Sequence, residues 1–97
     1  MIIGTTPTHR FNIPLDVVNI DEVHILYSQY EDVKIRKVKA DCKLYDRTIE
    51  VKLSQEETFL FSNAPVSVQI RVKCGETVLS SRIFPLMADK CLEKEVM

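Results

Sequence analysis

Apolar and polar residues alternate with a period of two along most of the chain. The pattern is clearest on the two sides of residues 54–58. Side chains of a β-strand point alternately to opposite faces, so this alternation is typical of strands with one buried face. It predicts two half-buried strands of an all-β domain. Their apolar positions are Ile49, Val51 and Leu53 before this segment, and Val66, Val68, Ile70 and Val72 after it.

The same alternation predicts further strands at regular spacing. Short turn sequences separate them about every 8–12 residues, as in antiparallel sandwiches. We therefore expect an antiparallel immunoglobulin-like β-sandwich of about seven strands. The predicted strands are residues 9–13, 22–30, 33–39, 42–45, 48–53, 65–73 and 77–84.

Local signals predict how these strands are joined. Asp46-Arg47 separates two alternating runs and favours a tight hairpin turn. Gly75, one of only two glycines, is expected to adopt a positive φ in the last hairpin. Ser54 followed by Glu57 has the spacing of a capping box, which predicts one helical turn. The alternation slips near Val38, which favours a β-bulge there.

Nothing in the sequence divides the chain, so residues 1–97 are expected to form a single domain with its core in residues 8–87. Residues 88–97 form a charged tail with weak periodicity. Leu92 and Val96 lie four residues apart in it, so the tail is expected to be either a short helix or a frayed end.

Composition and charge limit the possible partners. Hydrophobic residues make up 45% and charged residues 28% of the chain, as in folded globular domains, and no segment is long and apolar enough to span a membrane. Thirteen basic and 14 acidic residues give a net charge of -1. This balance provides no field that would attract nucleic acid or anionic lipid. We expect a cytoplasmic protein without membrane or nucleic-acid partners.

The residues that most often carry chemistry are few and scattered. His9 and His24 are the only histidines, and the cysteines Cys42, Cys74 and Cys91 are widely spaced. A metal site needs three or four converging donors, and a phosphate-binding loop needs several glycines. Acidic pairs fall at predicted turns, where solvated carboxylates are common. We therefore expect no enzyme activity, cofactor, metal or small-molecule substrate.

One basic cluster lies on the predicted strand 33–39, which carries Lys34, Arg36, Lys37 and Lys39. One interpretation is a surface for single-stranded nucleic acid, with Tyr27, Tyr30 and Tyr45 as the aromatic side chains on which bases stack. Alternatively, exposed lysines protect the edge of a sheet from aggregation. The nearly neutral total charge favours the second interpretation, and both leave room for docking of another protein.

Three segments resemble small immunoglobulin-like β-sandwich domains of tailed phages and prophages, including the N-terminal domain of phage baseplate upper proteins. They are residues 51–61, 66–72 and 75–78, which form a leucine–polar–polar–acidic–threonine corner, an alternating strand and a glycine hairpin. The resemblance implies a non-enzymatic structural protein of a tail or baseplate, whose partners are other phage structural proteins or further copies of itself. It would lie in the cytoplasm of the bacterial host and, once assembled, in the virion.

These considerations give one candidate interaction surface and one alternative function. The surface combines the basic strand with the apolar residues of the tail. The alternative is a cytosolic binding module of a mobile element that binds a peptide, a glycan or nucleic acid. The candidate surface residues are Lys34, Arg36, Lys39, Leu92 and Val96.

Overall fold

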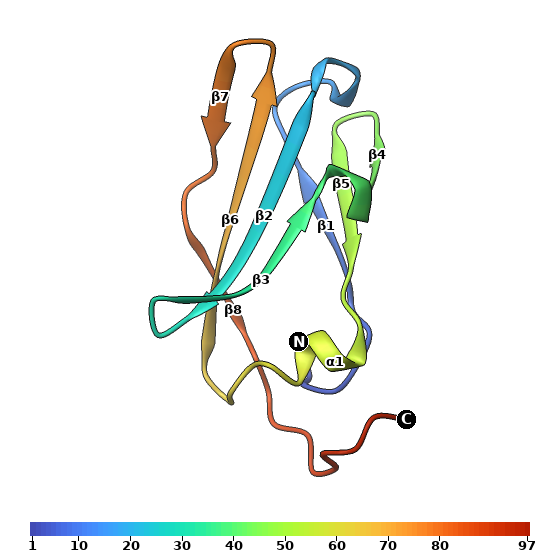
Figure 1. The fold of residues 1–97 in the computed structure, drawn as a ribbon, viewed down its shortest axis with the longest axis vertical. Helices are drawn as coiled ribbons and strands as arrows, with labels where there is room; N and C mark the ends of the chain where they lie inside the picture. The colour runs from blue at the N-terminus through green and yellow to red at the C-terminus, as the bar shows by residue number, and fades with distance from the viewer.

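The computed structural model describes residues 1–97, which fold into a β-sandwich of two antiparallel sheets (Figure 1). The strands are β1 (Thr8–Asn12), β2 (Glu22–Gln29), β3 (Asp32–Val38), β4 (Cys42–Tyr45), β5 (Thr48–Lys52), β6 (Pro65–Cys74), β7 (Thr77–Ser80) and β8 (Phe84–Met87). One sheet has the order β1-β5-β4, and the other has the order β3-β2-β6-β7, with β8 also paired to β6. The predicted all-β sandwich is confirmed, with eight strands in place of seven.

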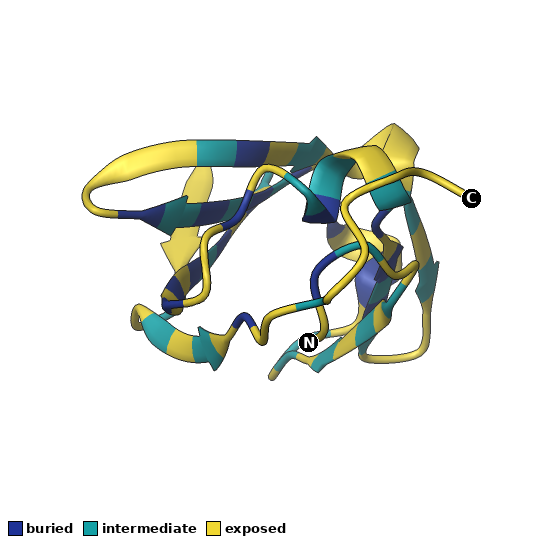
Figure 2. Ribbon diagram, turned by 90° about the horizontal axis from the view of Figure 1, so that it is seen from below, coloured by how far each residue is buried: buried dark blue, intermediate teal, exposed yellow.

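The core lies between the sheets and is built largely on β2 and β6, the two longest strands. Their inward-facing residues pair across the sheet, with Ile25 opposite Ile70 and Tyr27 opposite Val68. From the other sheet, Ile49 is completely buried. Figure 2 shows buried and exposed residues alternating along the strands of both layers. Full burial of one such aliphatic side chain contributes about 1.5–3 kcal/mol, so the alternating pattern directly reflects what holds the sheets together.

The strand order is that of an immunoglobulin-like sandwich in which the place of the first strand is empty. In such folds strands A, B, E and D form one sheet, and C, F and G form the other. Here β1, β5 and β4 correspond to B, E and D, while β2, β6 and β7–β8 correspond to C, F and G, with β3 added beside β2. β1 pairs only with β5, so its other edge has no neighbouring strand.

Three short helical segments join the strands: η1 (Val17–Asn19), η2 (Lys39–Asp41) and α1 (Gln55–Thr58). At α1, Ser54 Oγ accepts a hydrogen bond from Glu57 N at 3.1 Å, and Glu57 Oε1 accepts one from Ser54 N at 2.9 Å. The predicted capping box is therefore confirmed. Both predicted hairpins also form, with Gly75 at φ +60° and Asp46 at φ +50°. Aspartate tolerates this left-handed conformation, which explains a tight turn without glycine.

The β-bulge in β3 lies at a different place from the one predicted. Tyr27 pairs with Ile35 and the next residue, Ser28, pairs with Val33, so Lys34 is the extra residue. The slip near Val38 has another cause, because β3 ends there and η2 begins. As a result of the bulge, Val33 is exposed while Ile35 is buried.

The predicted strand 77–84 is interrupted in its middle. β7 ends at Ser80 and β8 begins at Phe84. Between them, Ser81 N donates to Ile70 O at 2.8 Å, and Ser81 Oγ accepts from Ile70 N at 2.9 Å. The hydroxyl takes the place of a backbone carbonyl as the partner of Ile70, so the regular ladder stops at this point. β8 then pairs with the first half of β6.

Candidate interaction surface

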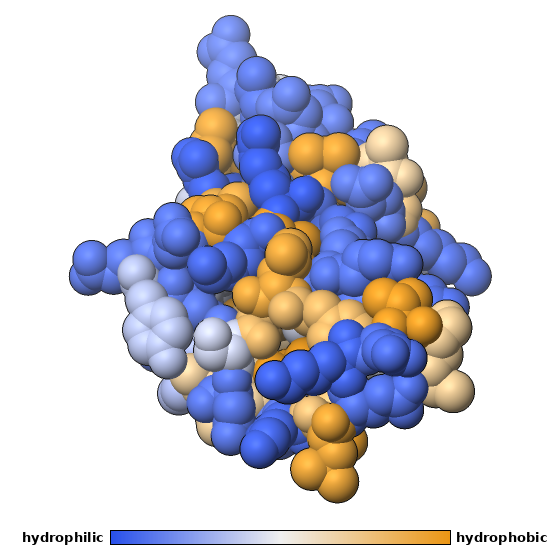
Figure 3. Space-filling model, turned by 60° about the horizontal axis from the view of Figure 1, so that its bottom comes forward, coloured by the Kyte–Doolittle hydropathy of each residue, from blue (hydrophilic) through white to orange (hydrophobic).

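One end of the sandwich carries α1, both ends of the chain and several exposed apolar side chains. Figure 3, with this end turned forward, shows apolar side chains gathered among polar ones. Leu92 and Met97 are 92% and 94% exposed. Monomeric domains rarely expose a large apolar patch, and such patches often mark docking sites. We call this end the terminal face; its exposed apolar residues are Ile2, Leu60, Met87, Leu92, Val96 and Met97.

The first residues of the chain are held against the segment that follows β8. Ile3 N donates to Asp89 O at 2.9 Å, and Asp89 N donates to Met1 O at 2.8 Å. The Met1 ammonium group also donates to Met87 O at 3.0 Å. These contacts pair the two segments in parallel and bury Ile3. Met87 stays exposed beside them, so this pairing forms one side of the terminal face.

The tail, residues 88–97, contains no helix. The helical alternative is therefore wrong, because the chain end is held by side-chain contacts in place of a helical hydrogen-bond ladder. Gln55 Nε2 donates to Met97 O at 3.2 Å, and Met97 N donates to Gln55 Oε1 at 2.7 Å. The amide of Gln55 thus binds the backbone of Met97 as a neighbouring strand would. This contact directs the tail across the end of α1.

A cavity of about 650 Å³ lies between the tail and α1. Phe59 and Phe61 give it an apolar wall, and Glu56 contributes a charged group from α1. Val96 borders the cavity, whereas Leu92 lies outside it and is exposed. The two tail residues predicted from the sequence therefore belong to the same face but have different surroundings.

Gly4 and Thr58 hold the N-terminal segment against α1 beneath the terminal face. Thr58 is completely buried, and its hydroxyl accepts from Gly4 N at 2.9 Å and donates to Thr5 O at 3.0 Å. Gly4 has φ +83°, and a Cβ at this position would lie 2.7 Å from Phe59 Cζ. Both the backbone conformation and the close phenyl ring therefore require glycine here.

The predicted basic residues lie away from the terminal face. Lys34 is the bulged residue of β3, and Arg36 lies two residues further along, with its guanidinium 3.2 Å from His24 Nε2. Lys39, in η2, donates to Ile20 O at 3.0 Å. β3 is an edge strand and so forms a flank of the sandwich. In Figure 1 it runs through the middle of the view, whereas the tail lies at the lower end of the molecule. The five candidate residues therefore lie on two separate surfaces.

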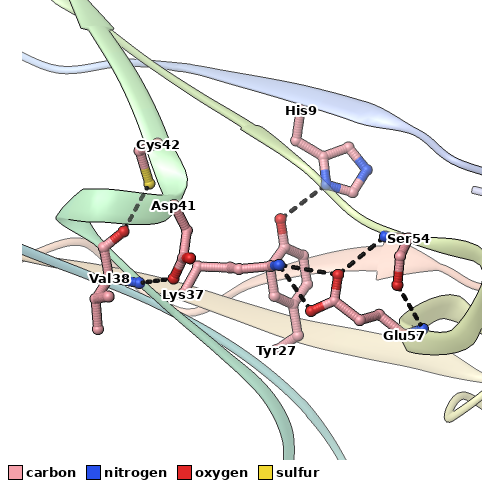
Figure 4. Close-up of polar contacts among 8 residues, drawn as sticks. All are labelled: His9, Tyr27, Lys37, Val38, Asp41, Cys42, Ser54 and Glu57. Atoms are coloured by element: carbon pink, nitrogen blue, oxygen red, sulfur yellow. Dashed lines mark hydrogen bonds and ion pairs between the residues drawn. The ribbon is translucent and has the colours of Figure 1, made fainter.

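Polar side chains also meet inside the sandwich (Figure 4). Tyr27 of β2 is completely buried, and its hydroxyl lies 2.8 Å from His9 Nδ1 of β1. Burial, followed by the positive N-terminus, lowers the pKa of His9, and burial raises the pKa of Tyr27 well above its ordinary value. The pair therefore consists of a neutral imidazole and a protonated phenol at neutral pH. It links the two sheets across the core.

Lys37 belongs to the predicted basic cluster but points inward, with its side chain only 14% exposed. Its Nζ lies 2.7 Å from Glu57 Oε2 and 2.8 Å from Glu57 Oε1. Partial burial raises the pKa of Glu57, but hydrogen bonds from Lys37 and from Ser54 N outweigh it and hold this pKa below its ordinary value. The ion pair fixes α1 against β3.

Cys42 lies near this cluster but is not activated (Figure 4). Its Sγ donates to Val38 O at 3.3 Å. Burial, followed by the nearby Asp41 carboxylate, raises the pKa of Cys42 to about 11, so the thiol is protonated at neutral pH. Every buried side-chain nitrogen and oxygen atom has a hydrogen-bond partner. The interior polar groups therefore act as cross-links between elements.

Two of these cross-linking residues carried a signal in the sequence that the prediction did not use. His9 lies two residues before the inward-facing Phe11, and Lys37 lies two residues after the buried Ile35. Residues two apart on a strand share a face, so both side chains had to point toward the core. Their pairing with Tyr27 and Glu57 could not be predicted, because these partners come from distant parts of the chain.

No family model matches the sequence, and no curated protein or solved structure is significantly similar to the chain. No helix in the structure combines the length and apolar character required to cross a membrane. The terminal face and the free edge of β1 are the two surfaces best suited to bind another protein.

Proposed function

We propose that this chain is a non-enzymatic structural protein of a phage or prophage tail or baseplate, which docks on a neighbouring protein of the particle through the terminal face. The main support for docking is the group of six large apolar side chains that are exposed around α1 and the two ends of the chain. The place in a phage particle is supported by the motif resemblance of residues 51–61, 66–72 and 75–78.

Burial of apolar surface would drive this docking. Leu92 is almost fully exposed, and burying a side chain of its size contributes about 1.5–3 kcal/mol. The tail is irregular, and its last residue is held by the two hydrogen bonds to Gln55. It can therefore adjust to a partner with little loss of internal contacts. Glu93, Lys94 and Glu95 lie exposed between Leu92 and Val96 and add the polar groups that accompany apolar ones in a typical interface.

The experiment compares incorporation of variants into particles. The double variant Leu92→Asp/Val96→Asp should be lost from purified particles, while its thermal midpoint stays within about 2 °C of the wild type because both residues are exposed. Val18→Asp is the matched control, because Val18 is 81% exposed in η1 and lies outside the terminal face. Equal incorporation of both variants would discard the terminal face as the docking site.

The flank of β3 is tested separately with Lys34→Glu/Arg36→Glu. Both residues were candidates for docking, but they lie outside the terminal face. If docking uses only the terminal face, this variant should be incorporated like the wild type. Loss of this variant alone, with the tail variant retained, would move the docking site to the flank.

A further inference from the structure

The free edge of β1 lies beside an apolar groove. The groove has a volume of about 400 Å³ and lies between β1 on one sheet and β6, β7 and β8 on the other. This is the side of the sandwich where the first strand of an immunoglobulin-like fold would lie. The apolar residues that matter here are Phe11, Ile13, Ile70, Val72, Leu79 and Phe84.

Leu79 indicates that this side of the core is uncovered. It pairs with Val72 and therefore faces the same way, toward the other sheet, yet it is 42% exposed. Val72 is itself more exposed than Val66, which lies at the other end of β6. The opposing sheet ends at β1, which has no neighbour on this side. One more strand beside β1 would cover these residues.

β1 also presents free backbone groups along the groove. Ile13 N donates to Arg47 O, beside β5. Hydrogen-bonding direction alternates along an antiparallel strand, so the odd-numbered residues of β1 bond toward β5. The backbone N–H and C=O groups of Thr8, Arg10 and Asn12 therefore point to the free edge. No strand pairs with them there.

We propose that this groove accepts an extended acidic segment of another protein, which pairs antiparallel with β1 and takes the place of the missing first strand. The backbone of the segment would bond to Thr8, Arg10 and Asn12. Every second side chain would enter the groove and cover Leu79. Strand addition of this kind takes affinity from main-chain hydrogen bonds and specificity from alternate side chains.

Arg10 is the reason why a segment with negative charge is preferred. It lies at the centre of the free edge with its side chain 62% exposed, and its Nε contacts Glu50 Oε1 at 2.8 Å, which leaves its two terminal nitrogens available. A carboxylate opposite Arg10 would complete a cross-strand charge pair.

Arg10 also makes it unfavourable for a second copy of this chain to occupy the groove. If two β1 edges paired in the antiparallel register that satisfies all three free residues, Arg10 would lie directly opposite Arg10 of the other copy. Like charges directly opposite each other destabilise a strand pair. Charged residues on an edge are a common means of preventing self-association. The groove therefore favours an acidic strand from a different protein, and this inference does not depend on a place in a phage particle.

The test uses two synthetic nine-residue peptides of alternating valine and threonine, one with glutamate and one with lysine at the central outward position. The glutamate peptide should slow hydrogen exchange of the Thr8, Arg10 and Asn12 amides and bind at least tenfold more tightly than the lysine peptide. Arg10→Glu should reverse this preference, whereas Arg36→Glu, on the other edge of the opposite sheet, should leave it unchanged.

Three results would overturn the proposal. The first is normal exchange of these three amides at saturating glutamate peptide. The second is equal binding of both peptides. The third is concentration-dependent protection of the same amides without peptide, accompanied by dimer formation, which would assign the groove to a second copy.

Discussion

Lys37 of β3 and Glu57 of α1 form an ion pair of 2.7 Å that closes one side of the sandwich. β3 is an edge strand of the four-stranded path, and α1 follows β5 of the other sheet, so the pair joins the two layers. On the other side, no ion pair joins β1 to β7; the rings of Phe11 and Phe84 meet with their centroids 5.8 Å apart, and the apolar groove lies open beside them. The two sides of the sandwich therefore differ: on one side an ion pair joins the two sheets, and on the other the edge of β1 is free.

Removing the Lys37 side-chain charge should destabilise the fold. Lys37→Met leaves Glu57, whose side chain is 27% exposed, without its partner, and we expect a loss of about 1–2 kcal/mol in the free energy of unfolding. Urea denaturation measures the change. Lys34→Met is the matched control, because its 3.4 Å pair with the exposed Asp32 is worth less than about 0.5 kcal/mol. Equal losses would show that the inner pair has no structural role.

The half-buried His9 makes stability depend on pH near neutrality. Its pKa in the folded state lies below the unfolded value of about 6.5, so the unfolded chain binds the proton more readily. The free energy of unfolding should therefore be highest above pH 6.5 and fall as the pH drops toward the folded pKa. In His9→Gln this decline should disappear, whereas the control His24→Gln should retain it. Urea titrations between pH 7.5 and 5 measure the effect, and an unchanged decline in His9→Gln would contradict it.

Gly4 should tolerate no side chain. In Gly4→Ala the new Cβ would collide with the Phe59 ring and force an unfavourable backbone conformation, at a cost of about 2–3 kcal/mol. Gly75→Ala is the control: it also has a positive φ, but open space surrounds it, so about 1 kcal/mol is expected. Thermal unfolding of the two variants gives the comparison. A Gly4 variant as stable as the Gly75 variant would mean that the terminal segment moves away without cost.

The hydrogen bonds of Gln29 should stabilise the segment after α1, so that their loss lowers the free energy of unfolding. It is 2% exposed, and its amide donates to Ser62 O and Ala64 O and accepts from Ser62 N at 2.8 Å. Gln29→Leu leaves Ser62 N without a partner, whereas Ser62 O and Ala64 O keep their hydrogen bonds from Ala64 N and Ala88 N. We therefore expect a loss of about 1–3 kcal/mol, the cost of one buried unpaired donor. Gln69→Leu, which removes one hydrogen bond to Ser81, should cost less than about 1 kcal/mol. Chemical denaturation distinguishes the two, and similar costs would contradict the assignment.

The parts of the fold that depend on local sequence could be predicted. Alternation identified β2, β5 and β6 because one face of each is buried, and the capping box at Ser54 and Glu57 depends only on residues three apart. The bulge at Lys34 could not be located, because the alternation around it is compatible with several registers. The register is set by pairing of β3 with β2, which the sequence of β3 alone does not reveal.

The candidate surfaces depend on long-range contacts, and these were not visible in the sequence. Leu92 and Val96 were singled out from the tail alone, whereas Ile2 and Met87 join them only because the first residues pair with the segment after β8. The groove beside β1 has the same origin. Whether an edge strand has a neighbour is a property of the whole sheet and not of its own residues.

The most direct test of the proposed place in a particle is quantitative mass spectrometry of phage particles purified from an induced culture of the source strain. The proposal predicts that this chain is present at a fixed ratio to the major tail protein. Particles that form normally without the chain, while it is abundant in the cytosol, would contradict a structural role in the particle.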